Sequence, residues 1–234
     1  MEKVIFIDIP KCATTSILVA LQDFIRPKKN IVLLNPEYGK GLARHVNLKS
    51  YAEFNDHIDA TIFTCIRNPY DRMVSLYKYY KKIGAKPNPD DPHELKASEY
   101  IQEKDTFSKF VYDCHQVNQR LPLRTRDCMT HMDIITSGHD AYFKLNRFPY
   151  SDVFLKNMTM MCFGPKIDHI LRYESLDQDW KKMCKELDWP HKPLRKTNVS
   201  QDNNSWETFY NDNDLNMVSE IFKSDFKKFG YEIH

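Results

Sequence analysis

The sequence has no strong excess of one charge sign. It carries 34 Lys and Arg residues against 32 Asp and Glu residues, which leaves a formal charge of +2. So small a net charge gives no indication of a nucleic-acid or membrane partner, and any basic site must be local. The chain also lacks the low hydrophobicity of disordered proteins, because 41% of its residues are hydrophobic. A length of 234 residues therefore predicts a single α/β domain covering residues 1–234.

Long hydrophobic runs are missing from the beginning of the chain. The apolar residues Val4–Ile7 are followed closely by Asp8, Pro10 and Lys11. This stretch is neither a signal peptide nor a transmembrane segment. We therefore expect a cytoplasmic protein, or a lumenal one if the sequence is a trimmed part of a longer chain.

The cysteines show no repeating spacing, and a chain of this length needs no disulfides to fold. We expect them to be mostly reduced and buried. They are Cys12, Cys65, Cys114, Cys128, Cys162 and Cys184.

Apolar runs alternate with segments of helical periodicity, which favours a parallel sheet flanked by helices. Strands are expected at Val4–Ile9, Ile31–Leu34, Ala60–Ile66 and Ile167–Leu171. Helices are expected from Thr14 to about Ile25, from an N-cap at Asp71, at Thr106–Cys114 and at Asp177–Leu187, with one last helix carrying Leu215, Val218, Phe222 and Phe226. The proline-rich stretch Gly84–His93 is predicted to be a surface excursion, and residues 121–157 have no clear pattern.

The segment Pro10–Ser16 lies where the first strand gives way to a helix. Such a junction aims unpaired backbone N–H groups at one point, with the helix dipole behind them. Lys11 adds a mobile positive charge, and the hydroxyls of Thr14, Thr15 and Ser16 add neutral donors. The pattern fits a phosphate site, although a lysine beside a capping Thr pair explains it as well. The glycine spacing of the P-loop is missing.

A second cluster, Arg67–Ser75, follows the strand at Ala60–Ile66. Arg67 could fork a phosphate and Ser75 could donate a hydrogen bond to it. We interpret Asp71 only as a helix N-cap and Arg72 as a solvated side chain. Two anion sites after two strands of one sheet indicate a ligand with phosphates at both ends.

These two clusters resemble the phosphosulfate-binding loop and the 3′-phosphate motif of sulfotransferases. Further segments are similar in order to the Golgi-type carbohydrate branch of that family: Gly41–Val46, Ile167–Leu176, Asn198–Ser200 and Asp225–Tyr231. One departure is Ala13, which stands where many sulfotransferases have glycine. A Cβ at this position restricts φ and the approach of the backbone to a phosphate.

The resemblance implies a P-loop-NTPase-like sulfotransferase fold and 3′-phosphoadenosine-5′-phosphosulfate as donor, with no metal required. The 5′-phosphate side would be held by Lys11, Cys12, Ala13, Thr14, Thr15 and Ser16, and the 3′-phosphate by Arg67 and Ser75. Lys196 would close over the nucleotide. Lys11 would also neutralise charge on the departing phosphate, which makes it a catalytic candidate.

The resemblance also makes His45 the candidate catalytic base, because a neutral imidazole can accept a hydroxyl proton near pH 7. Its rivals are His131 and His139. These two, together with Cys128, could also be imagined as zinc ligands, but a fourth ligand at a sensible spacing is missing, so we predict no metal site.

The resemblance places the acceptor among carbohydrate hydroxyls. The stretches 84–93 and 121–157 hold polar, aromatic and basic residues suited to sugars, Arg124 and Arg126 among them, although ordinary surface loops would contain such residues too. Tyr77 and Tyr80 fit core packing better than an aromatic platform for a sugar. The alternatives to a sulfotransferase are a P-loop-type phosphotransferase and a non-catalytic protein that binds nucleotide or glycan. The sequence does not predict the oligomeric state.

Overall fold

The computed structural model describes residues 3–25, 31–33, 60–90, 106–120, 158–162, 166–195 and 204–234, with single positions between 95 and 102. Contacts divide the chain into two compact units. The first contains Met1–Asn68 and Met161–Val199, and the second contains Pro69–Met160 and Ser200–His234. Each unit is therefore built from two separate stretches of sequence.

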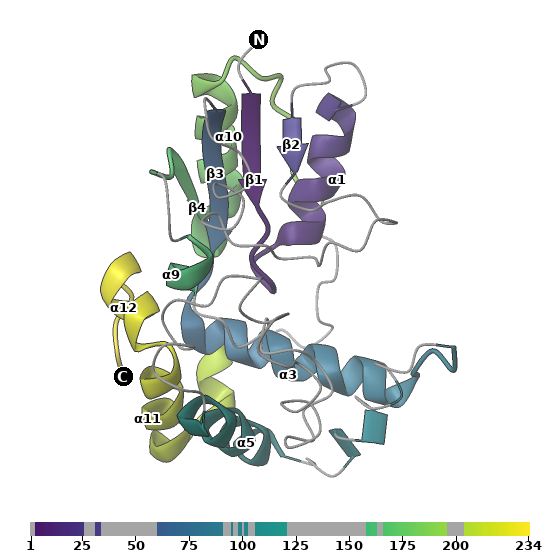
Figure 1. The fold of residues 1–234 in the computed structure, drawn as a ribbon, viewed down its shortest axis with the longest axis vertical. Helices are drawn as coiled ribbons and strands as arrows, with labels where there is room; N and C mark the ends of the chain where they lie inside the picture. The colour runs from purple at the N-terminus through teal and green to yellow at the C-terminus, as the bar shows by residue number, and fades with distance from the viewer. Residues whose placement is uncertain are drawn as a thin grey trace. The chain divides into compact units, whose positions relative to one another are not determined.

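The first unit contains a parallel sheet of four strands in the order β2-β1-β3-β4 (Figure 1). The strands are β1 (Lys3–Ile7), β2 (Ile31–Leu33), β3 (Ala60–Ile66) and β4 (His169–Arg172). Every pair of neighbours is parallel. The predicted α/β class with a parallel sheet is confirmed, and β3 has the predicted bounds.

Burial explains why β1 and β3 lie at the centre of this sheet. Central parallel strands are covered on both faces and therefore consist of nearly continuous apolar residues. Phe6 and Phe63 stack with their ring centroids 4.9 Å apart. The fully buried polar side chain of Thr64 in β3 donates its hydroxyl hydrogen to the carbonyl oxygen of Ile7 at 2.9 Å. This bond satisfies a hydroxyl that would otherwise be costly to bury.

Helices α1 (Thr14–Ile25) and α10 (Leu176–Glu186) flank the sheet in this unit (Figure 1). A short 3₁₀ turn, η2 (Tyr173–Ser175), joins β4 to α10. The Asp179 carboxylate accepts hydrogen bonds from the Arg172 N–H and the Ser175 hydroxyl, both at 2.8 Å. It thereby holds the junction between strand and helix.

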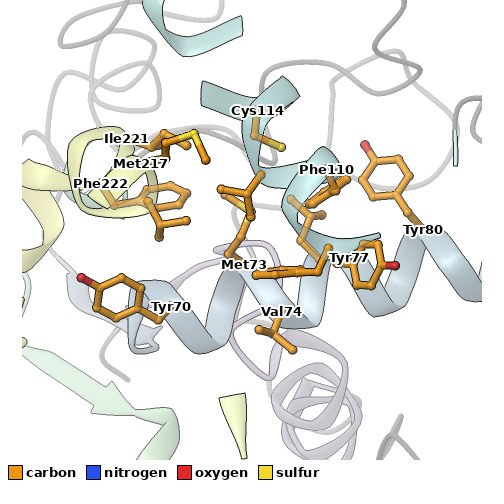
Figure 2. Packing of buried hydrophobic residues seen from close by; sticks show 14 of the residues in the cluster. Tyr70, Met73, Val74, Tyr77, Tyr80, Phe110, Cys114, Met217, Ile221 and Phe222 are labelled. Carbon is orange, nitrogen blue, oxygen red and sulfur yellow. The ribbon is translucent and has the colours of Figure 1, made fainter. Parts of the chain in front are cut away.

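The second unit is helical. Its elements are α3 (Pro69–Ala85), α5 (Phe107–Arg120), the short α9 (Met158–Met161), η3 (Trp206–Phe209), α11 (Asp212–Ile221) and α12 (Lys223–Phe229). Figure 2 shows side chains of α3, α5 and α11 meeting in one apolar core. Tyr77 and Tyr80 are buried in this core, as their spacing predicted.

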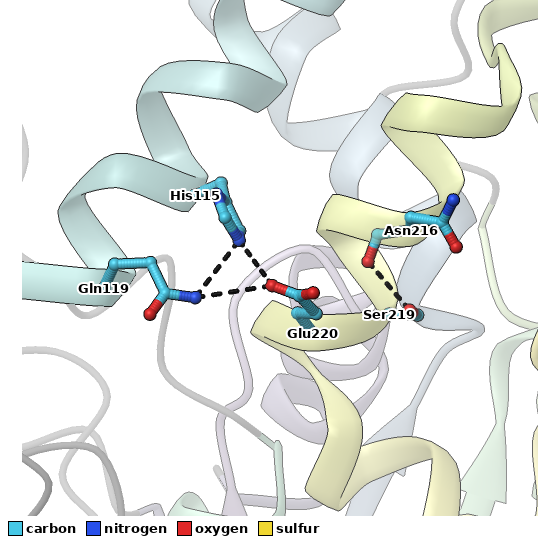
Figure 3. Close-up of polar contacts among 5 residues, drawn as sticks. All are labelled: His115, Gln119, Asn216, Ser219 and Glu220. Carbon is cyan, nitrogen blue, oxygen red and sulfur yellow. Dashed lines mark hydrogen bonds and ion pairs between the residues drawn. The ribbon is translucent and has the colours of Figure 1, made fainter.

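Polar contacts near the surface also connect α5 to α11 (Figure 3). The Nε2 atom of His115 lies 2.7 Å from a Glu220 carboxylate oxygen. The Gln119 amide contacts both side chains, at 3.2 Å and 3.4 Å. These three side chains hold the two helices together beyond the edge of the core.

Three local predictions about helices were wrong. Asp71 is not an N-cap, because α3 begins at Pro69, a residue whose missing N–H and fixed φ suit the first helical position. Arg72 is not solvated but 2% exposed, with its guanidinium 5.4 Å from the Phe222 ring. The last helix is two helices, because the chain leaves helical geometry at Phe222, between α11 and α12.

Other predicted boundaries shift by a few residues. β1 ends at Ile7 rather than Ile9, and β4 begins at His169 rather than Ile167. α5 runs on to Arg120, well past the predicted end. Gly84 belongs to α3 and not to the predicted excursion, whose residues 91–93 lie outside the described residues.

Five cysteines lie in the described part of the chain. All five are free and buried, in agreement with the prediction: Cys12, Cys65, Cys114, Cys162 and Cys184. Cys128 and the whole unassigned stretch 121–157 lie outside it. Among the described residues, no helix is long and apolar enough to span a membrane.

Candidate functional site

The loop between β1 and α1 makes a tight turn with two residues in the left-handed region. Lys11 has a φ of 67° and Ala13 a φ of 57°. A side chain makes this conformation cost about 1 kcal/mol or more per residue. The Cys12 N–H donates to the Ile9 carbonyl at 3.3 Å, and the Ala13 carbonyl accepts from the Ile17 N–H at 3.2 Å. The turn thus delivers the chain directly into the first turn of α1, where backbone N–H groups face outward along the helix axis.

A buried carboxylate holds this turn through a hydrogen bond. Asp8 is fully buried, and its Oδ1 accepts a 2.6 Å hydrogen bond from the Thr14 hydroxyl. The same hydroxyl lies 2.9 Å from the Ile9 carbonyl oxygen. The Thr14 hydroxyl hydrogen is therefore directed into the protein. In this arrangement Thr14 offers an anion its backbone N–H rather than its hydroxyl.

Arg67, the first residue after β3, contacts this loop. Its Nη1 donates to the Lys11 carbonyl oxygen at 3.1 Å. Lys11 and Arg67 were predicted to hold the two ends of one ligand, and the fold brings them together within the first unit. Both cations lie at the carboxyl ends of neighbouring parallel strands, which is where ligands bind in sheets of this type.

Two residues after β4 complete this arrangement. The Arg67 guanidinium carbon lies 3.9 Å from the centroid of the Tyr173 ring, which is a cation–π contact. The adjacent Glu174 accepts a 2.6 Å hydrogen bond from the Asn68 N–H. Residues 173 and 174 thus contact residues 67 and 68, one pair each.

Two buried cysteines lie close to Lys11 and Arg67 in the chain. They are Cys12 and Cys65, and each is 1% exposed. Burial raises the pKa of Cys65 well above its ordinary value, the charges of Cys12 and Glu174 raise it further, and Arg67 lowers it. A thiol in this state stays protonated and is a poor nucleophile. Cys65 therefore contributes packing rather than reactivity, and Cys12, whose side chain is buried, can reach a ligand only through its backbone.

The other predicted site residues belong to the second unit or lie outside the described residues. Ser75 lies on α3, in the second unit, with its side chain partly exposed. His45 and Lys196 lie outside the described residues, as do His131 and His139. Within the described ranges, no group of three His, Cys, Asp or Glu side chains is placed to hold a metal ion.

A comparison with protein-family profiles identifies the family of this chain. The profile of the sulfotransferase family matches residues 1–232, almost the whole chain. The chain belongs to the sulfotransferase family. No curated protein and no solved structure shows significant similarity to it.

This sulfotransferase is thus an enzyme that transfers a sulfuryl group to a hydroxyl-bearing acceptor. The sequence predicted roles for Lys11 and Arg67, which the fold brings together, but it assigned no role to Asp8, Tyr173 or Glu174. The only signal for Tyr173 and Glu174 in the sequence was their position shortly after the predicted strand Ile167–Leu171, and that this strand lies beside β3 came from the structure. Asp8 carried no comparable signal, since a polar residue at the end of a strand is ordinary.

Proposed function

We propose that this enzyme uses 3′-phosphoadenosine-5′-phosphosulfate as donor, with the loop Asp8–Ser16 at the 5′-phosphate and Arg67 at the 3′-phosphate. The observation that supports this most is the hydrogen bond from Arg67 to the Lys11 carbonyl, which joins the two predicted phosphate motifs. The left-handed turn at Lys11 and Ala13 also fits an anion, because it leaves the first turn of α1 open to one.

The residues of the loop have distinct roles in this proposal. The backbone N–H groups of Ala13, Thr14 and Thr15 bind phosphate oxygens, and the exposed Thr15 hydroxyl adds a donor. The Lys11 ammonium balances the negative charge that develops on the departing phosphate. When bound, the donor supplies the sulfuryl group that passes to the acceptor hydroxyl.

The remaining roles rest on the family resemblance. His45 accepts the proton of the acceptor hydroxyl, a role typically worth about 10² to 10⁴ in rate. Ser75 donates to the 3′-phosphate, and Lys196 closes over the nucleotide. Protein cations replace a divalent metal.

The proposed acceptor is a carbohydrate hydroxyl. The similarity in motif order to the Golgi-type carbohydrate branch supports it, and so do the basic and aromatic residues between 121 and 157. Arg124 and Arg126 would contact the acceptor, so replacing either residue should raise the acceptor KM more than it changes donor affinity.

Transfer of labelled sulfate tests this function directly. The enzyme is incubated with labelled donor and, in parallel, with a glycan panel, small phenols, steroids and tyrosine peptides. We expect label on a glycan, with chelators having no effect. Transfer only to phenols, steroids or tyrosine would overturn the carbohydrate acceptor and leave the donor in place. Magnesium-dependent transfer from another nucleotide would overturn the donor.

A further inference from the structure

We propose that Tyr173 and Glu174 are positioning residues that hold Arg67 in place for the 3′-phosphate of the donor. The proposal rests on the proposed function, because it assumes that Arg67 binds that phosphate. It adds two residues from η2, an element outside both phosphate motifs, and it assigns them separate tasks: Tyr173 holds the side chain and Glu174 holds the backbone.

Strand register explains why these residues meet. β3 and β4 are parallel, and Ile66 is the register partner of Arg172. Both strands end at this pair, so the next residues, Arg67 and Tyr173, emerge side by side. The residues after them, Asn68 and Glu174, form the 2.6 Å hydrogen bond. The pairing therefore continues past the ends of the strands through side chains.

The Tyr173 ring covers one face of the guanidinium and fixes the plane of its N–H donors. A cation above an aromatic face is held without using any of its N–H donors. Arg67 has five such donors, and Nη1 contacts the Lys11 carbonyl. Bidentate binding of a phosphate needs two donors in one plane, and stacking at 3.9 Å fixes that plane before the ligand arrives.

Glu174 acts on the chain rather than on the guanidinium. Its carboxylate accepts a hydrogen bond from the N–H group of Asn68, the residue directly after Arg67. This fixes the peptide plane between Arg67 and Asn68 and with it the direction of the Arg67 side chain. Replacement by Gln keeps an acceptor oxygen at this place, whereas replacement by Ala removes it.

The exposure of Tyr173 makes the proposal testable. The side chain is 39% exposed, so its removal leaves no large cavity in the core. Tyr112 on α5 is a matched control, because it is an exposed tyrosine, 53% accessible, on an element that belongs to neither phosphate motif. An unspecific effect of losing a surface tyrosine would show equally in Tyr112→Ala.

The experiment measures affinity for two nucleotides by calorimetry, 3′-phosphoadenosine-5′-phosphate and adenosine 5′-phosphate, which differ only in the 3′-phosphate. We expect the wild type to prefer the first. Tyr173→Ala and Tyr173→Leu should each reduce this preference by about two- to fivefold, the worth of an exposed cation–π contact. Tyr173→Phe should retain the preference, because the ring remains. Glu174→Ala should reduce it and Glu174→Gln should not.

The outcomes separate this proposal from the function on which it rests. A wild type without preference for the 3′-phosphate would overturn the proposed donor itself. A wild type with that preference, and an equal loss of both affinities in Tyr173→Ala and Tyr173→Leu, would place Tyr173 against the shared nucleoside and overturn its role toward Arg67. An unchanged preference in Tyr173→Leu would overturn that role as well. An unchanged preference in Glu174→Ala would overturn the role proposed for Glu174, which is to hold the backbone next to Arg67.

Discussion

Ala13 occupies a backbone position that favours glycine, with a φ of 57°. The cost of placing a Cβ there is offset locally, because the hydroxyl of the next residue, Thr14, donates to the Asp8 carboxylate and lies 2.9 Å from the Ile9 carbonyl oxygen. Lys11, two residues earlier, shares the left-handed conformation, and its carbonyl is held by Arg67. The loop is thus held in its strained form by its neighbours before any ligand binds.

Replacement of Lys11 or Arg67 tests the phosphate site at the scale of single residues. Lys11→Ala and Arg67→Ala should each weaken binding of 3′-phosphoadenosine-5′-phosphate by about 1–3 kcal/mol, as for the loss of a charge-assisted hydrogen bond. Calorimetry without added metal measures the effect. Lys181→Ala, which removes an exposed lysine of α10, is the matched control. Unchanged affinity in both site variants would contradict the assignment.

Replacement of His45 tests the proposed base. His45→Ala should lower turnover by about 10² or more, because the acceptor hydroxyl would keep its proton in the transition state. Affinity for the product nucleotide should stay near that of the wild type. Steady-state sulfate transfer and calorimetry measure the two quantities. Full activity in this variant would move the role to His131, His139 or a carboxylate.

The bounds of a helix or strand can be predicted from local sequence where one continuous pattern of apolar residues sets them. β3 has the predicted bounds because seven residues from Ala60 to Ile66 form an uninterrupted apolar or β-branched stretch. α3, by contrast, runs through Gly84, which the proline content had assigned to an excursion. Tertiary packing favours a glycine there, since a Cβ on Gly84 would collide with the Cγ2 atom of Ile101, and the Ser98 hydroxyl donates to the Gly84 carbonyl.

Gly84→Ala should therefore destabilise the protein despite the higher helix propensity of alanine. Overpacking of this kind costs about 1–3 kcal/mol, and urea denaturation measures it. Ile101→Leu moves the branch away from Cβ, so the double variant should lose less stability than the sum of the single changes. Additive losses would show that the contact with Ile101 is not the cause.

Asp225 gives the helical unit a defined pH dependence. It is fully buried, and its carboxylate accepts hydrogen bonds from the N–H groups of Met158 and Thr159 at 2.8 Å and 2.7 Å. Burial raises the pKa of Asp225 above its ordinary 3.8, while the Arg72 guanidinium and both N–H groups lower it. The native state thus keeps this proton to higher pH than the unfolded chain. The contribution of Asp225 to stability therefore falls as pH rises through the window that begins near 3.8.

Asp225→Asn should reveal this dependence. The amide carries a constant penalty because its NH₂ group faces backbone donors, but it does not titrate. The free energy of unfolding of the variant, relative to wild type, should therefore improve as pH is raised from about 4 to about 7. Urea denaturation at several pH values measures the difference. A difference that is constant, or that changes in the opposite direction, would contradict the raised pKa.

At the scale of the whole molecule, the chemistry of the cysteines distinguishes the folded from the unfolded chain. All five described cysteines are buried and free. Burial raises the pKa of Cys114 well above its ordinary value and that of Cys184 to about 11. A thiol reagent attacks thiolates, so native protein in a Cys128→Ser background should react slowly at neutral pH.

Denaturant should then expose all five thiols at once. Titration with a chromogenic disulfide reagent, with and without denaturant, measures both states. Fast reaction of one thiol in the native protein would show a site that is more open than its burial indicates. The sequence predicted the free thiols because their spacing is irregular, and it could not predict their burial one by one.

The sequence by itself determined the parallel α/β class and most strand positions, and it singled out the two cations that the fold brings together. These features depend on apolar periodicity and on short motifs, which are local in the chain. Only the tertiary structure decided that Arg67 contacts Lys11 and Tyr173 and that Asp8 holds Thr14. Only the fold could show that the final helix divides at Phe222, or that two separate stretches build each unit. The physical reason is that strand register and core packing join residues far apart in sequence, and neither leaves a local pattern.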